Sequence, residues 1–319
     1  MIGARKVLGH SDLAVSGLCL GTNTFGWTSD RETSFAVLDA YVAAGGNFLD
    51  TADSYSAWVE GNRGGESETI LGEWLATRGQ RDDVVLATKV SEHPEFKGLA
   101  PKTVAAAAEA SLRRLGTDHI DLYYAHFDDE QTPLEETVGA FEELRAAGKI
   151  RAVGLSNYTP ERIGAWFEIA RRTGASLPVA LQPHYNLVHR RDFEAGRRAV
   201  AQQEGLAVMP YFALASGFLA GKYRRREDLD GAARAGMAGK YLSESGVRVL
   251  DTLDEIAQRL EVEMSTVALA WLRTRPQVLA PIASARTPGQ LPALLAGAQL
   301  ELSAQDADAL TAVSHDMEN

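Results

Sequence analysis

Short apolar runs alternate along this chain with segments in which apolar residues recur every three or four positions. Continuous apolar runs are typical of strands that are buried on both faces. The intervening segments show helical periodicity, as in the stripe of Phe35, Leu38 and Val42. The runs that we interpret as strands are Leu18–Leu20, Phe48–Leu49, Val84–Ala87, Ile120–Tyr124, Ile150–Leu155, Val179–Leu181, Leu206–Tyr211 and Val278–Ile282.

Signals for helix ends fall in the gaps between these runs. Gly148 and Gly174 stand where helices should end, because glycine readily adopts the left-handed conformation of a C-terminal cap. Thr159 followed by Pro160 predicts a helix start, with proline in the first turn. A last helix is expected near Ser303–Val313.

Eight β-runs alternating with helices predict an α/β fold, a (β/α)₈ TIM barrel. We expect a single domain over residues 1–319, since such barrels commonly exceed about 250 residues as one unit. A doubly wound sheet is the competing fold, but Gly21–Gly26 lacks the G-x-G-x-x-G spacing that it would favour. The segment Gly217–Tyr223 is similarly one residue short of a P-loop and has Tyr after its Lys.

Two segments lie outside the alternation. Residues Arg5–Ser16 alternate around a Gly9–Asp12 turn, which predicts an N-terminal β-hairpin covering the bottom of the barrel. From Gly221 to about Gly246 the chain shows no periodicity, and we expect a long loop there, of the kind that is usually functional or mobile. Within it, Arg224–Arg226 is followed by acidic residues, which favours a solvated loop.

Composition narrows the class of protein. The chain has 319 residues, 45% of them hydrophobic, and a net charge of −11, which argues against a nucleic-acid partner while leaving room for a local basic pocket. Its one cysteine, Cys19, excludes an internal disulfide and fits a reducing compartment, so we expect a cytoplasmic protein. We find no secretory signal and no apolar run long enough to span a membrane.

Polar residues that suit proton transfer follow successive predicted strands. Asp50, Tyr55, Lys89 and His126 each lie at or just beyond a strand end, and parallel strand ends share one face of the barrel. Each residue alone is more often a cap or a surface group. Together, an ammonium that favours the phenolate, a carboxylate that holds the ammonium and a histidine beside the phenol suit protonation of a carbonyl oxygen.

The motifs resemble the aldo-keto reductase family, on its bacterial and potassium-channel β-subunit-like side, and the resemblance covers nearly the whole chain. Their order, spacing and strand placement all agree with that family. The stretches that carry the resemblance are Gly21–Gly26, Phe48–Tyr55, Gly65–Gly72, Ala87–Lys89, Asp121–His126, Gly154–Asn157, Gln182–Leu187, Pro210–Tyr211, Gly221–Tyr223 and Arg286–Gln290.

The resemblance implies an NADPH-dependent oxidoreductase that reduces aldehydes or ketones. Tyr55 would be the general acid, Lys89 would lower its pKa, Asp50 would orient Lys89 and His126 would position the carbonyl. Residues that the resemblance assigns to NADP(H) are Ser156, Asn157, Gln182 and Tyr211 at the nicotinamide, Leu214, Ser216 and Lys222 at the pyrophosphate, and Arg286 with Gln290 at the adenosine 2′-phosphate. Two departures, Ser284 for a common Gly and Leu294 for a polar residue, weaken the expected adenine contact.

Aromatic loop residues predict a pocket for apolar or aromatic carbonyl compounds. Trp27, Trp58, His93 and Phe127 are the candidate substrate residues, with Phe96 nearby, although some of them could simply pack loops. No metal motif appears, since His184 and His189 lack a third ligand. A cofactor-binding sensor or regulatory subunit, and a dehydrogenase oxidising a polyol or sugar, remain alternatives. The sequence leaves the oligomeric state open.

Overall fold

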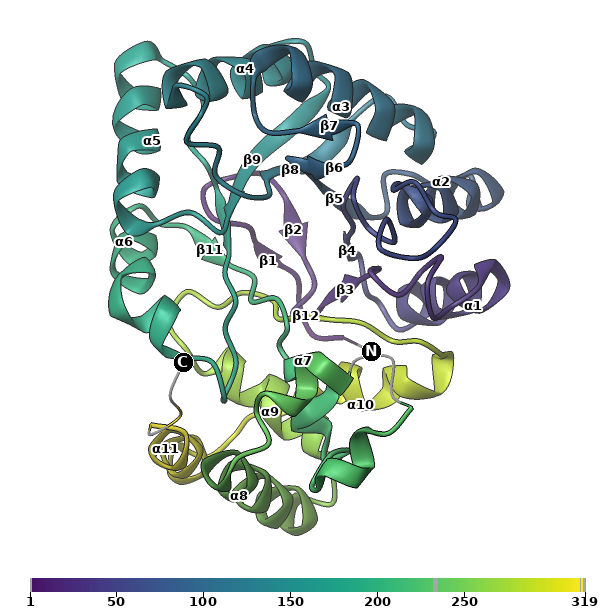
Figure 1. Cartoon of the computed structure of the whole chain (residues 1–319), viewed down its shortest axis with the longest axis vertical. Helices are drawn as coiled ribbons and strands as arrows, with labels where there is room; N and C mark the ends of the chain where they lie inside the picture. Colours follow the sequence, from purple (N-terminus) through teal and green to yellow (C-terminus); the bar gives the residue numbers. More distant parts are fainter. Residues whose placement is uncertain (1, 232–234, 316, 318–319) are drawn as a thin grey trace.

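Eight parallel strands form the centre of the molecule in the computed structural model, which describes residues 2–231, 235–315 and 317 (Figure 1). Hydrogen bonding links them in the order β11-β10-β9-β8-β5-β4-β3-β12. The strands are β3 (Cys19–Gly21), β4 (Phe48–Asp50), β5 (Val85–Val90), β8 (Ile120–Ala125), β9 (Ile150–Ser156), β10 (Ala180–Gln182), β11 (Ala207–Val208) and β12 (Ile282–Ala283).

The sheet closes on itself. β12 pairs in parallel with β3, and the segment that leads into β12 bridges β11 through Val208 and Val278. Each of the eight predicted apolar runs overlaps one strand of the barrel. The predicted (β/α)₈ barrel is therefore confirmed.

Helices surround the strands (Figure 1). Two of the expected helix boundaries are reproduced by local chemistry: the Thr159 side chain accepts the N–H of Arg162 at the start of α5, and Gly174 ends that helix at a φ of 78°. The helices are α1 (Arg31–Ala43), α2 (Glu66–Arg78), α3 (Pro101–Leu115), α4 (Leu134–Ala146), α5 (Pro160–Thr173), α6 (Arg198–Gln203), α7 (Ala235–Gly239), α8 (Glu244–Leu260), α9 (Met264–Arg273), α10 (Leu291–Gly297) and α11 (Ala304–Val313).

The N-terminal hairpin closes the bottom of the barrel, as the sequence predicts. Its strands are β1 (Lys6–Val7) and β2 (Ala14–Val15), and they pair antiparallel. Leu8, Leu13 and Val15 are buried in one apolar cluster with the residues that begin the barrel strands. At the hairpin turn, a Cβ on Gly9 would lie 2.4 Å from the carbonyl oxygen of Val179. This close approach requires glycine and fixes the hairpin against β10.

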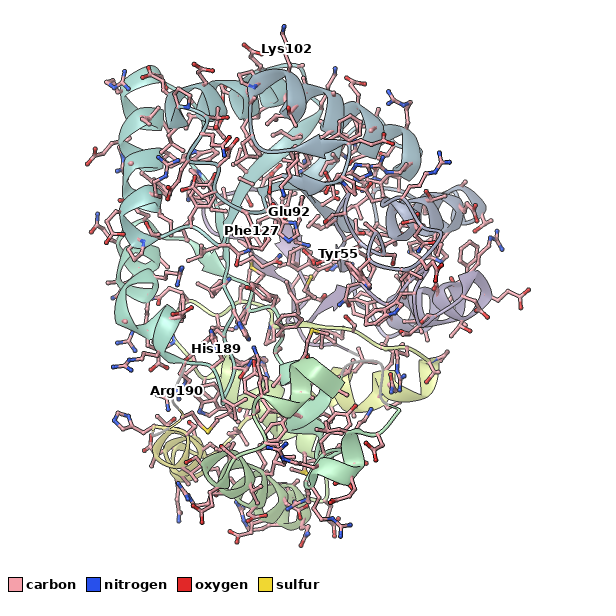
Figure 2. All side chains as sticks on the ribbon, in the orientation of Figure 1. Tyr55, Glu92, Lys102, Phe127, His189 and Arg190 are labelled. Atoms are coloured by element: carbon pink, nitrogen blue, oxygen red, sulfur yellow. The ribbon has the colours of Figure 1, made fainter. Side chains whose placement is uncertain are left out.

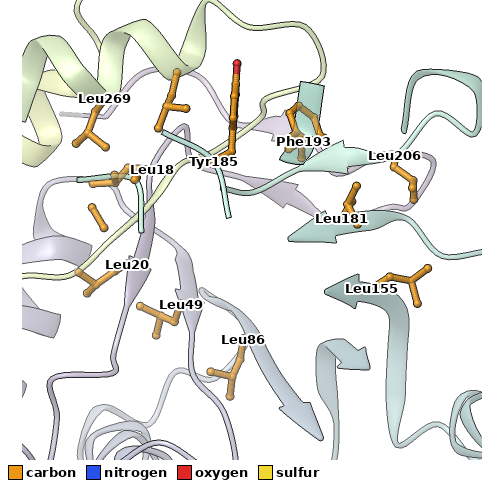
Figure 3. Close-up of a cluster of buried hydrophobic side chains, with 14 of the residues drawn as sticks. Leu18, Leu20, Leu49, Leu86, Leu155, Leu181, Tyr185, Phe193, Leu206 and Leu269 are labelled. Atoms are coloured by element: carbon orange, nitrogen blue, oxygen red, sulfur yellow. The ribbon is translucent and has the colours of Figure 1, made fainter. Parts of the chain in front are cut away.

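A second apolar cluster lies between the strands and the helices. It includes Leu20, Leu49, Leu86, Leu155 and Leu181, which point outward from five of the barrel strands (Figure 3). The helices supply the opposing side chains, among them the buried Val37, Leu38 and Phe141, with Phe35 and Val42 of the predicted stripe partly buried beside them. Two separate apolar layers, one inside the barrel and one around it, therefore hold the strand ends in place.

The segment after β11 is more ordered than the sequence indicates. Instead of one long loop, residues 221–246 include a 3₁₀ turn at Arg226–Leu229, the short helix α7 and the start of α8; residues 232–234 of that predicted loop lie outside the described residues. Arg224 pairs with Asp251 and Asp254 on α8, contacts between distant positions that local periodicity does not reveal. No helix in the described ranges is long and apolar enough to cross a membrane.

A substitution in the hairpin tests its part in closing the barrel. Leu8 is 0% exposed and Val7, next to it, is 57% exposed. We expect Leu8→Ala to lower the free energy of unfolding by about 2–5 kcal/mol, because it leaves a cavity inside the barrel. Val7→Ala should change it by no more than about 0.5 kcal/mol. Urea denaturation of both variants measures the difference, and equal small effects would show that the hairpin does not contribute to the core.

Candidate active site

Three barrel strands and the loops that follow them bring the four proton-transfer candidates together. Asp50 ends β4 and Tyr55 lies in the loop beyond it. Lys89 is the fifth residue of β5, and His126 directly follows β8. Figure 2 shows Tyr55 near the centre of the ring of helices in that view, close to Phe127. The structure therefore assembles the group that the strand positions predict.

Lys89 is the centre of this group. Its side chain is 0% exposed, and its ammonium lies 2.7 Å from Oδ2 of Asp50, 2.6 Å from the carbonyl oxygen of Thr51 and 2.8 Å from the hydroxyl of Tyr55. An ammonium has three N–H donors, so these three contacts can satisfy it completely. The other Asp50 oxygen, Oδ1, accepts the side-chain amide of Gln182 at 2.9 Å. The side chains of Lys89, Asp50, Tyr55 and Gln182 thus fix one another.

The pKa of Tyr55 is raised, whereas we expected from the sequence that Lys89 would lower it. Burial, and next the negative charge of Asp50, raise the pKa of Tyr55 well above its usual value. The ammonium of Lys89 acts in the opposite direction, because it favours the phenolate. The phenol is therefore protonated at neutral pH and can donate a proton, while Lys89 stabilises the charge that donation leaves behind.

His126 contributes a neutral ring to the same site. Burial, and then the nearby positive charge of Lys89, hold the pKa of His126 well below its usual value. Its ring centroid lies 6.4 Å from that of Tyr55. A neutral imidazole retains one N–H donor, which suits contact with a carbonyl oxygen rather than proton transfer to bulk solvent.

The residues expected at a nicotinamide form a hydrogen-bonded set beside this group. The Tyr211 hydroxyl donates to Oδ1 of Asn157 at 2.8 Å, and the Asn157 amide donates to the His126 carbonyl oxygen at 2.8 Å. Ser156 lies behind them, 1% exposed, with its hydroxyl donating to the Gln182 carbonyl oxygen. Asn157 holds a left-handed φ of 58°, which asparagine tolerates better than most residues.

One large cavity connects these residues with the rest of the predicted cofactor site. Its volume is about 1370 Å³, and it runs from the strand ends past the loop after β11 to the segment after β12. Most of the candidate residues contribute to its wall, which includes Asp50, Tyr55, Trp58, His126, Phe127, Asn157, Gln182, Tyr211, Leu214, Ser216, Lys222, Arg286 and Gln290.

The loop after β11 contributes backbone in unusual conformations. Phe212, Ala215, Ser216 and Gly217 all have positive φ, between 48° and 97°. Left-handed backbone in residues other than glycine costs free energy and is found mostly where a ligand or an active site requires it. Successive left-handed and right-handed residues also turn N–H groups toward one side, which is typical of anion sites. This loop is the segment that the family resemblance assigns to the pyrophosphate.

The segment after β12 places Arg286 in the wall of the cavity. Its backbone N–H donates to Oε1 of Gln290 at 2.8 Å, and its carbonyl oxygen accepts the Ser29 hydroxyl at 3.0 Å. Of the two departures noted in the sequence, Ser284 donates to Oδ1 of Asn23 at 2.6 Å, and Leu294 is 4% exposed in the outer core. Leu294 thus packs as an apolar residue, although it also borders the cavity.

Aromatic side chains form the rim of the cavity. Trp58 and Phe127 line it and are 54% and 41% exposed. Trp27 contacts Trp58 edge to face, with ring centroids 5.6 Å apart. His93 is elsewhere: it is 3% exposed and packs against Phe96 in the small hairpin of β6 (Glu92–His93) and β7 (Phe96–Lys97). Trp58 and Phe127 therefore line the cavity and Trp27 contacts Trp58, whereas His93 is not part of the cavity wall.

The cavity also includes residues that the sequence reasoning did not select. Phe212 is 37% exposed and lines the cavity. Its position directly after the candidate Tyr211 is a sequence signal that could have identified it. Asn23 joins the wall through its bond with Ser284. Glu261 and Glu263 approach from the end of α8 and the start of α9. No strand-end rule points to these two, because they come from helices. Among the described residues, no cluster of His, Cys, Asp and Glu could hold a metal ion.

Comparison with known proteins gives a consistent result. Residues 17–315 match the model of the Aldo/keto reductase family. Norsolorinic acid reductase stcV of Emericella nidulans is 35% identical over 96% of this chain and 80% of its own length. Protein tas of Escherichia coli is 33% identical over 92% of both chains. A probable voltage-gated potassium channel subunit beta of Oryza sativa is 32% identical over 90% of this chain and 88% of its own.

These likenesses cover nearly the whole chain, and they include the bacterial and channel-subunit relatives that the motifs indicate. The family consists of oxidoreductases that generally use NAD(P)H. The motifs, the closed barrel and the matched residues lead to one conclusion: the chain belongs to the aldo/keto reductase family.

Proposed function

We propose that this protein is an NADPH-dependent reductase of aldehydes or ketones, with Tyr55 as the general acid. The observation that carries the proposal is the position of the Lys89 ammonium. It lies within hydrogen-bond distance of both the Tyr55 hydroxyl and Asp50, which line a cavity whose wall also includes Arg286. A proton donor and a candidate phosphate-binding cation thus share one site.

The residues of the cavity fit a phosphorylated dinucleotide. A left-handed loop offers backbone N–H groups, and Lys222 and Arg286 offer positive charge in a protein whose net charge is −11. A guanidinium is the natural partner of a phosphate group. Asn157 and Gln182 offer amide groups, and Tyr211 offers a ring, at the end beside Tyr55. We infer that the nicotinamide lies at this end and the adenosine 2′-phosphate at Arg286.

The chain's own residues would then govern the proton. A reduced nicotinamide, when bound, supplies the hydride that attacks the substrate carbon. Tyr55, protonated because its pKa is raised, donates its proton to the carbonyl oxygen. Lys89 stabilises the phenolate as it forms, and Asp50 holds Lys89 in place. The neutral ring of His126 orients the carbonyl oxygen. The same groups in reverse would serve alcohol oxidation, which requires the phenolate.

The rim supports an apolar or aromatic substrate. Trp58 and Phe127 border the cavity and are substantially exposed, and Trp27 contacts Trp58 edge to face. Exposed aromatic rings of this kind are typical of sites that bind flat apolar ligands. One relative is named a norsolorinic acid reductase, so norsolorinic acid is a substrate to test beside simple aldehydes.

The first prediction concerns the proton donor. Tyr55→Phe should reduce the rate of carbonyl reduction by at least about 100-fold while leaving the Kd for NADPH near the wild-type value, because the phenol proton is needed only at the chemical step. Tyr123→Phe is the matched control, since the buried Tyr123 hydroxyl has no hydrogen-bond partner among the described residues. Steady-state turnover and fluorescence titration measure the two quantities. Retention of more than a tenth of the turnover would contradict the role of Tyr55.

The second prediction concerns Lys89 and pH. Because the pKa of Tyr55 is raised, reduction by the wild type should stay constant through neutral pH and fall only in alkaline solution, as the phenol loses its proton. Lys89→Met should reduce turnover by about 100-fold or more, because the forming phenolate loses its nearest positive charge. It should also move the alkaline fall to higher pH, because the ammonium that favours the phenolate is gone.

The control for this variant addresses charge balance. Lys89→Met leaves the buried Asp50 carboxylate without its ammonium, so the double variant Asp50→Asn/Lys89→Met is needed to separate folding from chemistry. The double variant should regain thermal stability but not turnover. A Lys89→Met enzyme with an unchanged pH profile would show that Lys89 supports the fold rather than the chemistry.

The third prediction concerns the choice of cofactor. Arg286→Ala should weaken NADPH binding roughly tenfold to hundredfold, the equivalent of about 1.5–3 kcal/mol for a charge-assisted hydrogen bond, and leave NADH binding nearly unchanged. Arg226→Ala removes another exposed guanidinium, from the 3₁₀ turn and outside the residues that line the cavity, and should affect neither cofactor. Equal losses for NADPH and NADH would indicate that Arg286 only supports its loop. A wild-type preference for NADH would refute the assignment.

A further inference from the structure

A stack of three rings lies behind the cavity at the position of Tyr211. The rings of Tyr211 and His184 are stacked, with centroids 5.2 Å apart and planes 22° apart. The rings of His184 and His189 are stacked more closely, at 3.6 Å and 13°. Figure 2 shows His189 below Tyr55 and Phe127 in that view. The two histidines, which form no metal site, therefore extend a stack that begins at the cavity wall.

The backbone holds Tyr211 and His184 in register. Their residues form a parallel β-bridge beyond the ends of β10 and β11, and the Tyr211 N–H donates to the Pro183 carbonyl oxygen at 2.9 Å. At the far tip of the ring, the Tyr211 hydroxyl donates to Asn157. Tyr211 is thus held at its backbone and at its hydroxyl, and His184 packs against one face of the ring between those two anchors.

The surroundings of His184 keep its ring neutral and fixed. Nε2 of His184 lies 3.2 Å from the Tyr241 hydroxyl and 3.5 Å from the Asn186 amide nitrogen. Burial, and then the charges of His189 and Lys240, lower the pKa of His184 to about 3. A neutral ring can stack on His189 without repulsion between charges. The same Asn186 amide donates to the carbonyl oxygen of Phe212, the left-handed residue after Tyr211.

We propose that His184 is a positioning residue for the cofactor: its ring, supported by His189, fixes the plane of Tyr211 against which the nicotinamide packs. The proposal rests on the function proposed above. Without His184, the Tyr211 ring would lose the side chain that covers one of its faces and would keep only its backbone bonds, its hydroxyl bond and the edge-to-face contact with Phe212, whose centroid lies 5.1 Å away. Cofactor binding would then have to immobilise the ring. The free-energy cost of ordering the Tyr211 side chain on binding should then weaken the affinity for the nicotinamide part of the cofactor by roughly threefold to tenfold.

Two ligands distinguish this role from general support of the loop. NADPH contains the nicotinamide, and 2′-phospho-ADP-ribose is the same cofactor without it. His184→Ala should weaken NADPH by about threefold to tenfold and leave 2′-phospho-ADP-ribose within about twofold of the wild type. His184→Phe, which restores a flat ring, should recover most of the NADPH affinity. His10→Ala, the same substitution at an exposed position in the bottom hairpin, should change neither.

The measurement is the Kd of each ligand, by quenching of tryptophan fluorescence. Equal losses for both ligands, or no rescue by His184→Phe, would overturn the inference and assign His184 to the fold. Unchanged NADPH affinity in His184→Ala would overturn it as well, with the proposed function intact. If the wild type itself bound no NADPH, the proposed function would fail, and this inference with it.

Discussion

The structure of the candidate site depends on one buried positive charge. Lys89 has no exposed surface, and a buried ammonium is strongly unfavourable unless it is paired and fully hydrogen-bonded. Its three contacts come from Asp50, Thr51 and Tyr55, so the chain that follows β4 must adopt the path that brings all three to β5. The position of the phenol is thus set by the need to satisfy the lysine.

The same requirement reaches the opposite side of the barrel. Asp50 bonds to Lys89 through one oxygen and to Gln182, at the end of β10, through the other. From there the contacts continue through neighbouring strand ends: Ser156 to the Gln182 backbone, and Asn157 to both the His126 backbone and Tyr211. A change at any of these residues therefore acts on a connected network. This connection explains why residues far apart in the sequence can hold a site with little freedom.

The sequence could predict much of this because strand ends are positioned by topology. Asp50, Lys89 and His126 were found by their place at the ends of apolar runs, whereas Asn157 came from the family resemblance. Eight such runs with helices between them are enough to indicate a barrel. Tyr55 lies further into a loop, so its contact with Lys89 follows from the motif more than from the strand pattern. Hydrophobic patterning also identified the N-terminal hairpin, because its apolar positions alternate with polar ones.

Properties that depend on three-dimensional surroundings could not be predicted in the same way. The pKa of Tyr55 is raised, since burial and Asp50 outweigh the ammonium, and the extent of burial is not visible in the sequence. His93 has the right type and an approximate position, but a small hairpin turns it into the protein. The spacing of His184 and His189 did not predict that their rings stack, because the stack depends on the turn of the chain between them.

The two ends of the barrel are built on different physical principles, and this difference accounts for where chemistry can occur. At the bottom, a hairpin fills the barrel with apolar side chains, which stabilises the fold and leaves little that can react. At the top, the chain keeps a buried lysine, unusual backbone conformations from Phe212 to Gly217, and exposed aromatic rings. Each of these features is unfavourable for folding taken alone. The apolar layers inside and around the strands supply the stability that allows such features to persist, and they confine them to the end where a cofactor and a substrate can use them.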